Sequence, residues 1–261
     1  MSDGPLHVTR SDAVLEVVLD RPKANAIDAA TSRAMGQVFA GFRDDPELRV
    51  AIITGAGEKF FSAGWDLKAA AQGEPPDADY GIGGFGGLQQ LPNLNKPVIA
   101  AVNGLAVGGG LELALSADLI VAAEHARFAL PEISAGTLAD AATIKLPRRI
   151  PYHVAMDMLL TGRWMEADEA LRWGLVNWVV PPGKVMSRAR ELAATLAAGP
   201  PLVFAAIKEL ARESERLTFG EAIARVMRKD FPTVAALYGS QDQVEGAKAF
   251  VEKRAPVWKG R

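Results

Sequence analysis

The chain has 261 residues, of which 49% are hydrophobic and 23% charged, enough apolar side chains to bury a sizeable core in one or two domains. A formal net charge of −2 provides none of the attraction on which binding to a phosphate backbone depends, and the lack of cysteine excludes disulfides, thiolate nucleophiles and sulfur-ligated metals. The amino terminus has no leader pattern and no apolar run nears the roughly 20 residues of a membrane span, so we expect a cytoplasmic protein with no nucleic-acid or membrane partner.

The first predicted elements are a strand at residues 14–19 and a helix after it. The segment 21–26 between them contains Pro22 and predicts a turn. Asp28 is placed to cap the helix. Four apolar residues at the spacing i, i+3, i+4 and i+7 gather on one face of that helix: Met35, Val38, Phe39 and Phe42.

Three short and nearly unbroken apolar runs follow, at residues 50–54, 98–102 and 119–123. They are rich in Val, Ile and Ala and are separated by stretches long enough for helices. Such runs are typical of strands that are buried on both faces. The sequence therefore predicts an α/β fold with a largely parallel sheet and helical layers around it.

A segment rich in Gly, Pro and Asp, residues 72–87, predicts a loop of some mobility. Within it, residues 81–86 match the dinucleotide pattern G-x-G-x-x-G by letters. That fingerprint must follow a strand and open a helix, whereas a proline-rich stretch precedes this one. We interpret it as a loop and not as a nucleotide site.

Other catalytic signatures are absent from the sequence. It contains no Walker A pattern, no H-E-x-x-H pair and no G-x-S-x-G elbow. The three histidines, His7, His125 and His153, are far apart in the chain, and a surface or core role is the simpler interpretation for each. Metal hydrolysis and serine hydrolysis are therefore poor explanations of this chain.

The carboxyl-terminal part is predicted to be helical, because strand signals fade after about residue 181. Helices are expected at residues 184–198, 201–215, 218–238 and 241–253. Such an appendage buries its apolar faces either on another copy of the chain or back on the core. We expect a homo-oligomer, and folding back onto the core is the alternative.

Two glycine-bearing turns, at residues 61–67 and 103–110, are each expected to join a strand to a helix. Turns of this kind expose backbone N–H groups at the positive end of the helix dipole. One N–H from each turn could hold a carbonyl oxygen that becomes an oxyanion. The alternative is that the glycines only permit tight packing between helix and sheet.

Two glutamates, Glu112 and Glu132, follow backbone turns and are the best indication of chemistry. Two carboxyl groups that converge on one substrate can act as acid and base if their surroundings separate their proton affinities. Glu112 lies in an otherwise apolar stretch, although an acid in the first turn of a helix also complements the dipole. Glu132, directly after Pro131, could be a solvated loop residue. Spacing alone does not bring the two together.

Four strings, at residues 63–66, 97–104, 108–114 and 249–254, resemble the enoyl-CoA hydratase/isomerase (crotonase) superfamily, and the likeness covers essentially the whole chain. The resemblance implies a crotonase-like spiral of ββα repeats over residues 1–195 and a helical oligomerisation region over residues 196–261. It implies a homotrimer or a hexamer built as a dimer of trimers. It also implies an acyl-CoA substrate and no metal or cofactor, coenzyme A being part of the substrate.

The same resemblance implies roles for individual residues. It assigns the oxyanion-hole N–H groups to Trp65 and Gly109, exchange of the α-proton to Glu132, and handling of the β-hydroxyl or attacking water to Glu112. Phe250 and Lys253 of a neighbouring subunit are possible further contacts. The implied substrate-binding residues are Lys23, Ala24, Ala26, Ala63, Asp66, Leu67, Lys68, Pro131 and Asp140.

Residues 19–28, 51–71 and 256–261 resemble the branch of the superfamily whose acyl substrates carry a trimethylammonium group. An aromatic face such as Trp65, or a carboxylate such as Asp140, would suit that cation. The alternatives are that Trp65 is a packing residue and that Asp140 caps the following helix.

One segment departs from the family pattern. The proline and the glycine pair that usually follow the second acid are missing from residues 136–143, which line the acyl pocket in the family. Specificity for the acyl group is therefore open between the trimethylammonium substrates and another acyl-CoA, acted on by a hydratase or isomerase. A non-catalytic scaffold is a third interpretation, which retention of both acids disfavours.

Overall fold

The computed structural model describes residues 4–261. Met1–Asp3, at the amino terminus where the sequence has no leader pattern, lie outside the described residues. The strands are β1 (Leu6–Ser11), β2 (Val14–Leu19), β3 (Val50–Gly55), β4 (Phe60–Ser62), β5 (Val98–Val102), β6 (Leu105–Val107), β7 (Leu119–Ala123), β8 (Arg127–Ala129), β9 (Met165–Glu166) and β10 (Trp178–Val180). The helices are α1 (Ala29–Asp44), α2 (Leu67–Ala71), α3 (Gly109–Ala114), α4 (Glu132–Ala135), α5 (Asp140–Lys145), α6 (Tyr152–Thr161), α7 (Ala167–Arg172), α8 (Val185–Ala197), α9 (Pro201–Ser214), α10 (Phe219–Arg228), α11 (Pro232–Tyr238) and α12 (Gln241–Glu252), with 3-10 turns η1 (Phe85–Gly87) and η2 (Leu146–Arg148).

The strands form two sheets. The larger has the order β1-β2-β3-β5-β7-β10, and all its pairs are parallel except β1 with β2. The predicted strands β2, β3, β5 and β7 and the largely parallel sheet are thus confirmed. In the smaller sheet, β4-β6-β8-β9, the first three strands are parallel to one another and the edge strand β9 is antiparallel to β8. Its strands have only two or three residues each, too few to show a hydrophobic period in the sequence.

The chain alternates regularly between the two sheets. β3, β5 and β7 lie in the large sheet, each is followed by a strand of the small sheet, and each pair is followed by a helix. Because β4, β6 and β8 are parallel neighbours, their carboxyl ends lie side by side at one end of the small sheet. The three turns that lead into α2, α3 and α4 therefore meet at the carboxyl end of these strands. Ligands of α/β proteins commonly bind at that end of a sheet.

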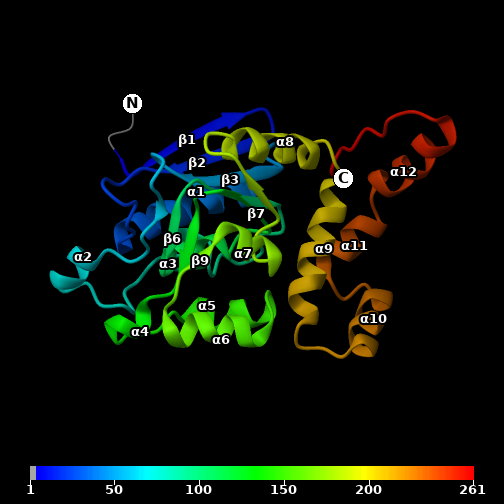
Figure 1. Ribbon diagram of the computed structural model, residues 1–261. Coiled ribbons are helices and arrows are strands. Elements are labelled where there is room, and N and C mark those ends of the chain that lie inside the picture. Colours follow the sequence, from blue (N-terminus) through cyan, green and yellow to red (C-terminus); the bar gives the residue numbers. More distant parts are fainter. Residues whose placement is uncertain (1–3) are drawn as a thin grey trace.

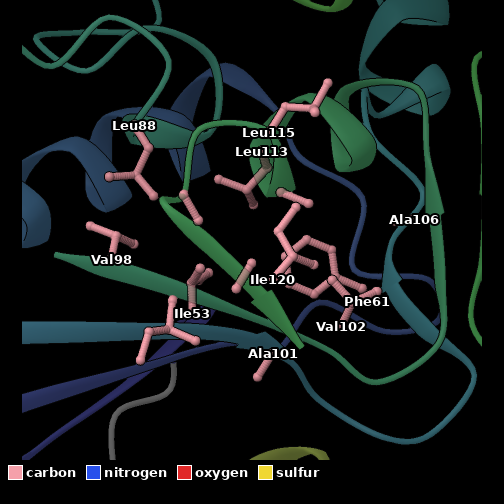
Figure 2. Packing of buried hydrophobic residues seen from close by; sticks show 14 of the residues in the cluster. Ile53, Phe61, Leu88, Val98, Ala101, Val102, Ala106, Leu113, Leu115 and Ile120 are labelled. Carbon is pink, nitrogen blue, oxygen red and sulfur yellow. The ribbon is translucent and has the colours of Figure 1, made fainter. Parts of the chain in front are cut away.

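The buried core fixes the helices that surround this end of the small sheet. Asp28 caps α1 by accepting a hydrogen bond from the Thr31 N–H at 2.7 Å, and the predicted apolar face of α1 is buried or half-buried. Figure 2 shows Leu113 of α3 among the side chains of the sheet, including Ile53 and Ile120. Since α3 is buried along its whole length, its position relative to the sheet is set by packing.

The carboxyl-terminal helices α9 to α12, orange to red in Figure 1, stand beside the rest of the molecule. The helices α9 to α11 share a small buried cluster of their own, centred on Phe231 and Val234. An ion pair of 2.7 Å from Lys208 of α9 to Asp118 links them to the core.

The single helix predicted at residues 218–238 is wrong. The chain forms α10 and α11 there, because Lys229 adopts a left-handed conformation at φ 59° and ends α10. Pro232, which lacks an N–H, begins α11.

Over residues 4–261 no single helix is long and apolar enough to cross a membrane, although the bent pair Val185–Ala197 and Pro201–Ser214 meets both criteria jointly.

Candidate active site

Two backbone turns touch at the carboxyl end of the small sheet. The Ile27 N–H donates to the Gly64 carbonyl at 2.7 Å and the Asp66 N–H donates to the Ile27 carbonyl at 2.9 Å, which leaves the Trp65 N–H facing the other way. Gly109 is the first residue of α3, so its N–H has no acceptor within the helix. A Cβ on Gly64 would lie 2.6 Å from the Gly109 nitrogen. The structure therefore brings together the two turns that carry the predicted oxyanion donors.

Glycine is required where these turns approach their neighbours. Gly64 has φ +79°, and the Cβ of any other residue would also lie 2.6 Å from the Val107 carbonyl oxygen. Gly108 has φ +53°, and a Cβ there would lie 2.5 Å from Oε1 of Glu132. The Glu132 carboxyl group therefore lies directly against the turn that opens α3.

Glu112 is a buried acid with two hydrogen-bond donors. Its side chain projects from α3 with a relative exposure of 6%, its Oε1 accepts from the Ala142 N–H at 2.8 Å, and its Oε2 accepts from Nε2 of Gln89 at 3.2 Å. Burial raises its pKa, the charge of Asp140 adds to the rise, and the two hydrogen bonds oppose it. Complementing a helix dipole does not require such burial, so Glu112 has the features of a functional acid.

Glu132 begins α4 and is half-buried. Its Oε2 is buried and has no hydrogen-bond partner among residues 4–261. Burial, and then the charge of Glu112, raises the pKa of Glu132 to about 7. Glu132 is therefore not the solvated loop acid of the alternative interpretation, and it lies within electrostatic reach of Glu112.

The predicted contacts around the coenzyme lie on two adjacent segments, because the Ala63 N–H donates to the Ala24 carbonyl at 2.9 Å. Asp66 caps α2 and also pairs with Arg21 at 3.1 Å, two contacts that sequence reasoning missed. Lys23, Leu67 and Lys68 are exposed, whereas Ala24, Ala26, Ala63, Asp66 and Pro131 are half-buried.

Trp65 and Asp140 differ in how firmly they are held. Nε1 of Trp65 donates to Oε1 of Glu74 at 3.3 Å, and both Glu74 oxygens lie 3.1 Å from the Ala29 nitrogen at the start of α1. The indole is thus tied to α1, which supports a packing role. Asp140 does not cap α5: Ala139 is the cap, and Oδ1 of exposed Asp140 accepts from the neighbouring Ala141 N–H at 2.7 Å.

Sequence reasoning missed Gln89, Ala142 and Phe85 in this site. The Gln89 and Ala142 contacts with Glu112 span 23 and 30 positions, and no local pattern announces them. The Phe85 ring lies against Gly109, where a Cβ would be 2.4 Å from Cε1 of the ring. A signal for Phe85 existed, since it is an aromatic residue enclosed by glycines on both sides.

A cavity of about 710 Å³ lies behind α3, between the core and α9. Its lining includes Gln89 and Lys145 but none of the two acids or the two predicted oxyanion donors. Nζ of Lys145 donates to Oγ of Ser116 at 2.9 Å, and burial lowers the pKa of Lys145 to about 8. Among residues 4–261, no group of three or more His, Cys, Asp or Glu side chains is arranged to hold a metal ion.

Comparisons with known proteins agree with this geometry. The family model for enoyl-CoA hydratase/isomerase matches residues 9–261. The chain is 57% identical over 260 residues to carnitinyl-CoA dehydratases of Escherichia coli (strain SMS-3-5 / SECEC) and Salmonella typhi, covering 98% of each chain. The crystal structure of an enoyl-CoA hydratase from Mycobacterium tuberculosis superposes with a TM-score of 0.90 at 39% identity, covering 98% of this chain and 99% of that one.

A second solved structure, an enoyl-CoA hydratase from Bacillus anthracis, gives a TM-score of 0.89 at 32% identity and covers 99% of this chain and all of that one. The alternation of strands between two sheets, with a helix after each pair, is the spiral of ββα repeats expected from the sequence resemblance. The chain therefore belongs to the enoyl-CoA hydratase/isomerase family and has the crotonase fold.

Proposed function

We propose that this chain is a hydro-lyase that adds water to, or removes it from, the α,β double bond of an acyl-CoA thioester, with L-carnitinyl-CoA and crotonobetainyl-CoA as its substrates. The observation that carries the proposal is the placement of Glu112 and Glu132 around the turn that also presents the Gly109 N–H. The 57% identity to carnitinyl-CoA dehydratases supports the choice of acyl group. The reaction uses two carboxyl groups and two amides, and requires no metal or cofactor.

The mechanism follows from where charge develops. In hydration, ionised Glu112 takes a proton from water while the water oxygen bonds to Cβ, and the electrons of the double bond move toward the thioester oxygen. The N–H groups of Trp65 and Gly109 stabilise the negative charge on that oxygen. Protonated Glu132 then delivers its proton to Cα. Dehydration runs the same steps backward, so ionised Glu132 removes the α-proton and protonated Glu112 protonates the departing hydroxyl.

A second candidate is an enoyl-CoA hydratase or isomerase that acts on another acyl-CoA. The departure from the family pattern at residues 136–143 favours it, because this segment supplies the Ala142 N–H that donates to Glu112 and lacks the proline and glycine pair of the family pattern. The same acids and amides would serve either substrate.

A panel of thioesters separates the two candidates. Purified protein is incubated with carnitinyl-CoA, crotonobetainyl-CoA and neutral short-chain enoyl-CoA and 3-hydroxyacyl-CoA thioesters, and the conjugated enoyl absorbance is followed. We expect the highest kcat/KM with the trimethylammonium substrates. Activity confined to neutral acyl chains would establish the second candidate instead.

A single proton shared by the two acids sets the expected pH dependence. Burial, and then the charge of Glu112, raises the pKa of Glu132 to about 7, so Glu112 ionises first and Glu132 keeps the last proton. Both directions need one proton on the pair. We therefore expect kcat/KM to fall as the pH rises through about 7 and to fall again in acid, where a second proton binds.

Water addition takes up no net proton, so the equilibrium constant does not vary with pH and hydration and dehydration must share one profile. Initial rates in both directions across neutral pH measure it. A kcat/KM that stays level from pH 6 to about 9 would contradict the shared-proton account.

We also propose that residues 196–261 form an oligomerisation region beside a core of residues 1–195, giving a homotrimer or a dimer of trimers. Three apolar side chains one helical turn apart on α10 are exposed in the single chain: Phe219 at 83%, Ile223 at 44% and Met227 at 77%. Exposed Phe250 at the end of α12 and Lys253, its cap, would then be offered to a neighbouring subunit. Sedimentation equilibrium measures the mass of the assembly.

The proposal includes a cytoplasmic location, with which the lack of cysteine agrees.

A further inference from the structure

The glycine-rich loop at residues 81–87 has a place in the fold that its letters do not reveal. Gly83, Gly84, Gly86 and Gly87 are buried, and a Cβ on Gly87 would lie 2.4 Å from the Gly36 nitrogen of α1. The loop is therefore packed tightly against α1. Its glycines leave Phe85 as the aromatic side chain that the loop presents.

Phe85 reaches the candidate active site. Its ring lies against Gly109, as the 2.4 Å approach of a built Cβ to Cε1 shows. Tyr80 and Phe85 pack in a T-shaped arrangement, with ring centroids 5.4 Å apart and planes at 77°. Oη of Tyr80 donates to the Pro76 carbonyl at 3.0 Å, which holds the second ring in place. The Phe85 ring thus adjoins one of the amides proposed to hold the thioester oxygen, and the Tyr80 ring packs against Phe85.

Carboxylates act on these rings, and one cation, Arg33, lies beside them with its Nη1 donating to the Asp79 carbonyl at 2.6 Å. Burial is the main cause that raises the pKa of Tyr80 to about 12, and the charges of Glu74 and Asp140 add to the rise. The charge of Asp140 also raises the pKa of Glu112. A second cation, Lys145, donates to Ser116 and lines the cavity behind α3. A cation placed beside the rings would meet carboxylates and aromatic faces.

The proposed acyl group carries such a cation close to the reacting carbons. Its quaternary nitrogen is two bonds from Cβ and has no N–H, so hydrogen bonds cannot recognise it. Aromatic faces and carboxylate charge are the groups that bind quaternary ammonium ions. When the thioester oxygen is held at the Trp65 and Gly109 amides, the short acyl chain keeps the nitrogen near the residues that adjoin Gly109.

We infer that Phe85, braced by Tyr80, is the aromatic wall that recognises the quaternary ammonium tail of the acyl group, with Asp140 supplying negative charge from the adjacent helix. This inference rests on the proposed function and adds to it the residues that determine specificity. It also gives the glycine-rich loop a purpose, which is to carry Phe85 to the oxyanion turn.

The test compares crotonobetainyl-CoA with 5,5-dimethylhex-2-enoyl-CoA, in which carbon replaces the quaternary nitrogen. The readout is the ratio of the two kcat/KM values, so a general loss of activity cancels. Phe85→Leu and Tyr80→Leu should each lower the cationic preference, Phe85→Leu by about tenfold, which corresponds to about 1.4 kcal/mol. Phe85→Trp should keep the preference, because indole is the best aromatic partner of a cation. Tyr152→Leu is the matched control, since Tyr152 is 60% exposed at the start of α6 and packs on His153.

The outcomes distinguish this inference from the proposed function. If the wild-type chain prefers the cationic substrate and Phe85→Leu and Tyr80→Leu both keep that preference, the aromatic wall is wrong and the function stands. If the wild-type chain acts on the neutral thioester alone, the proposed function is wrong, and the inference with it. Should Phe85→Leu fail to fold, Tyr80→Leu and Phe85→Trp still decide. Asp140→Asn should lower the ratio less, and added salt should shrink its effect.

Discussion

Replacing Glu132 with Gln should lower kcat in both directions by about 10²–10⁴-fold, the range that general acid–base catalysis contributes. The amide keeps the shape of the side chain but can neither accept the α-proton nor return it. Because Oε2 of Glu132 has no hydrogen-bond partner among the described residues, the substitution breaks no bond at that atom and should fold normally. Steady-state rates with carnitinyl-CoA and crotonobetainyl-CoA measure the effect.

Glu124→Gln is the control for this substitution. Glu124 is exposed in the turn between β7 and β8, at the opposite end of β8 from Glu132, and should leave kcat unchanged. Retention of kcat within a few fold in Glu132→Gln would show that another group moves the proton.

A saturated acyl-CoA with the same tail separates the roles of the two acids. It has no hydroxyl to lose, so exchange of its α-hydrogen with deuterated water needs only the base. Glu132→Gln should lose this exchange, whereas Glu112→Gln should keep it and lose hydration and dehydration. Exchange that survives in Glu132→Gln and disappears in Glu112→Gln would reverse the assignment.

The large sheet was predictable from the sequence, and the small one was not. β3, β5 and β7 are apolar runs of five or six residues, long enough to be recognised as buried strands. β4, β6 and β8 have three residues each, and their pairing depends on contacts between distant segments. Yet these short strands place the turns that carry Trp65, Gly109 and Glu132. Local patterns therefore identified the site residues, and the fold was needed to show that they meet.

Errors at single residues have the same origin. Asp140 was a reasonable helix cap by type, but α5 begins one residue earlier than that role requires, so the carboxyl group accepts from the adjacent Ala141 N–H instead. The glycines at residues 81–87 form a loop as predicted, but composition does not report what packs against a backbone. Their burial against α1 follows from tertiary contacts alone. Gln89 and Ala142 were missed because a buried carboxylate does not specify its donors in sequence.

Replacing Gly64 with Ala should lower kcat by about 10²–10³-fold, the loss measured when one oxyanion-hole donor is removed. The new Cβ would lie 2.6 Å from both the Gly109 nitrogen and the Val107 carbonyl oxygen. Both are backbone atoms held by the sheet and α3, so they cannot yield as the end of a flexible side chain does. The two turns must separate, and the amides of Trp65 and Gly109 can no longer converge on one oxygen.

Gly57→Ala isolates this collision from backbone strain. Gly57 has φ +78° against +79° for Gly64, but a Cβ there meets nothing within 4 Å. Both variants should lose about 1–2 kcal/mol of stability from the left-handed conformation, and Gly64→Ala should lose more because of the contact. Denaturant unfolding measures stability, and kcat with crotonobetainyl-CoA measures the oxyanion site. Equal kcat in the two variants would mean that the contact between the Gly64 and Gly109 turns does not position the amides. The collision, which only Gly64→Ala introduces, would then have no effect on catalysis.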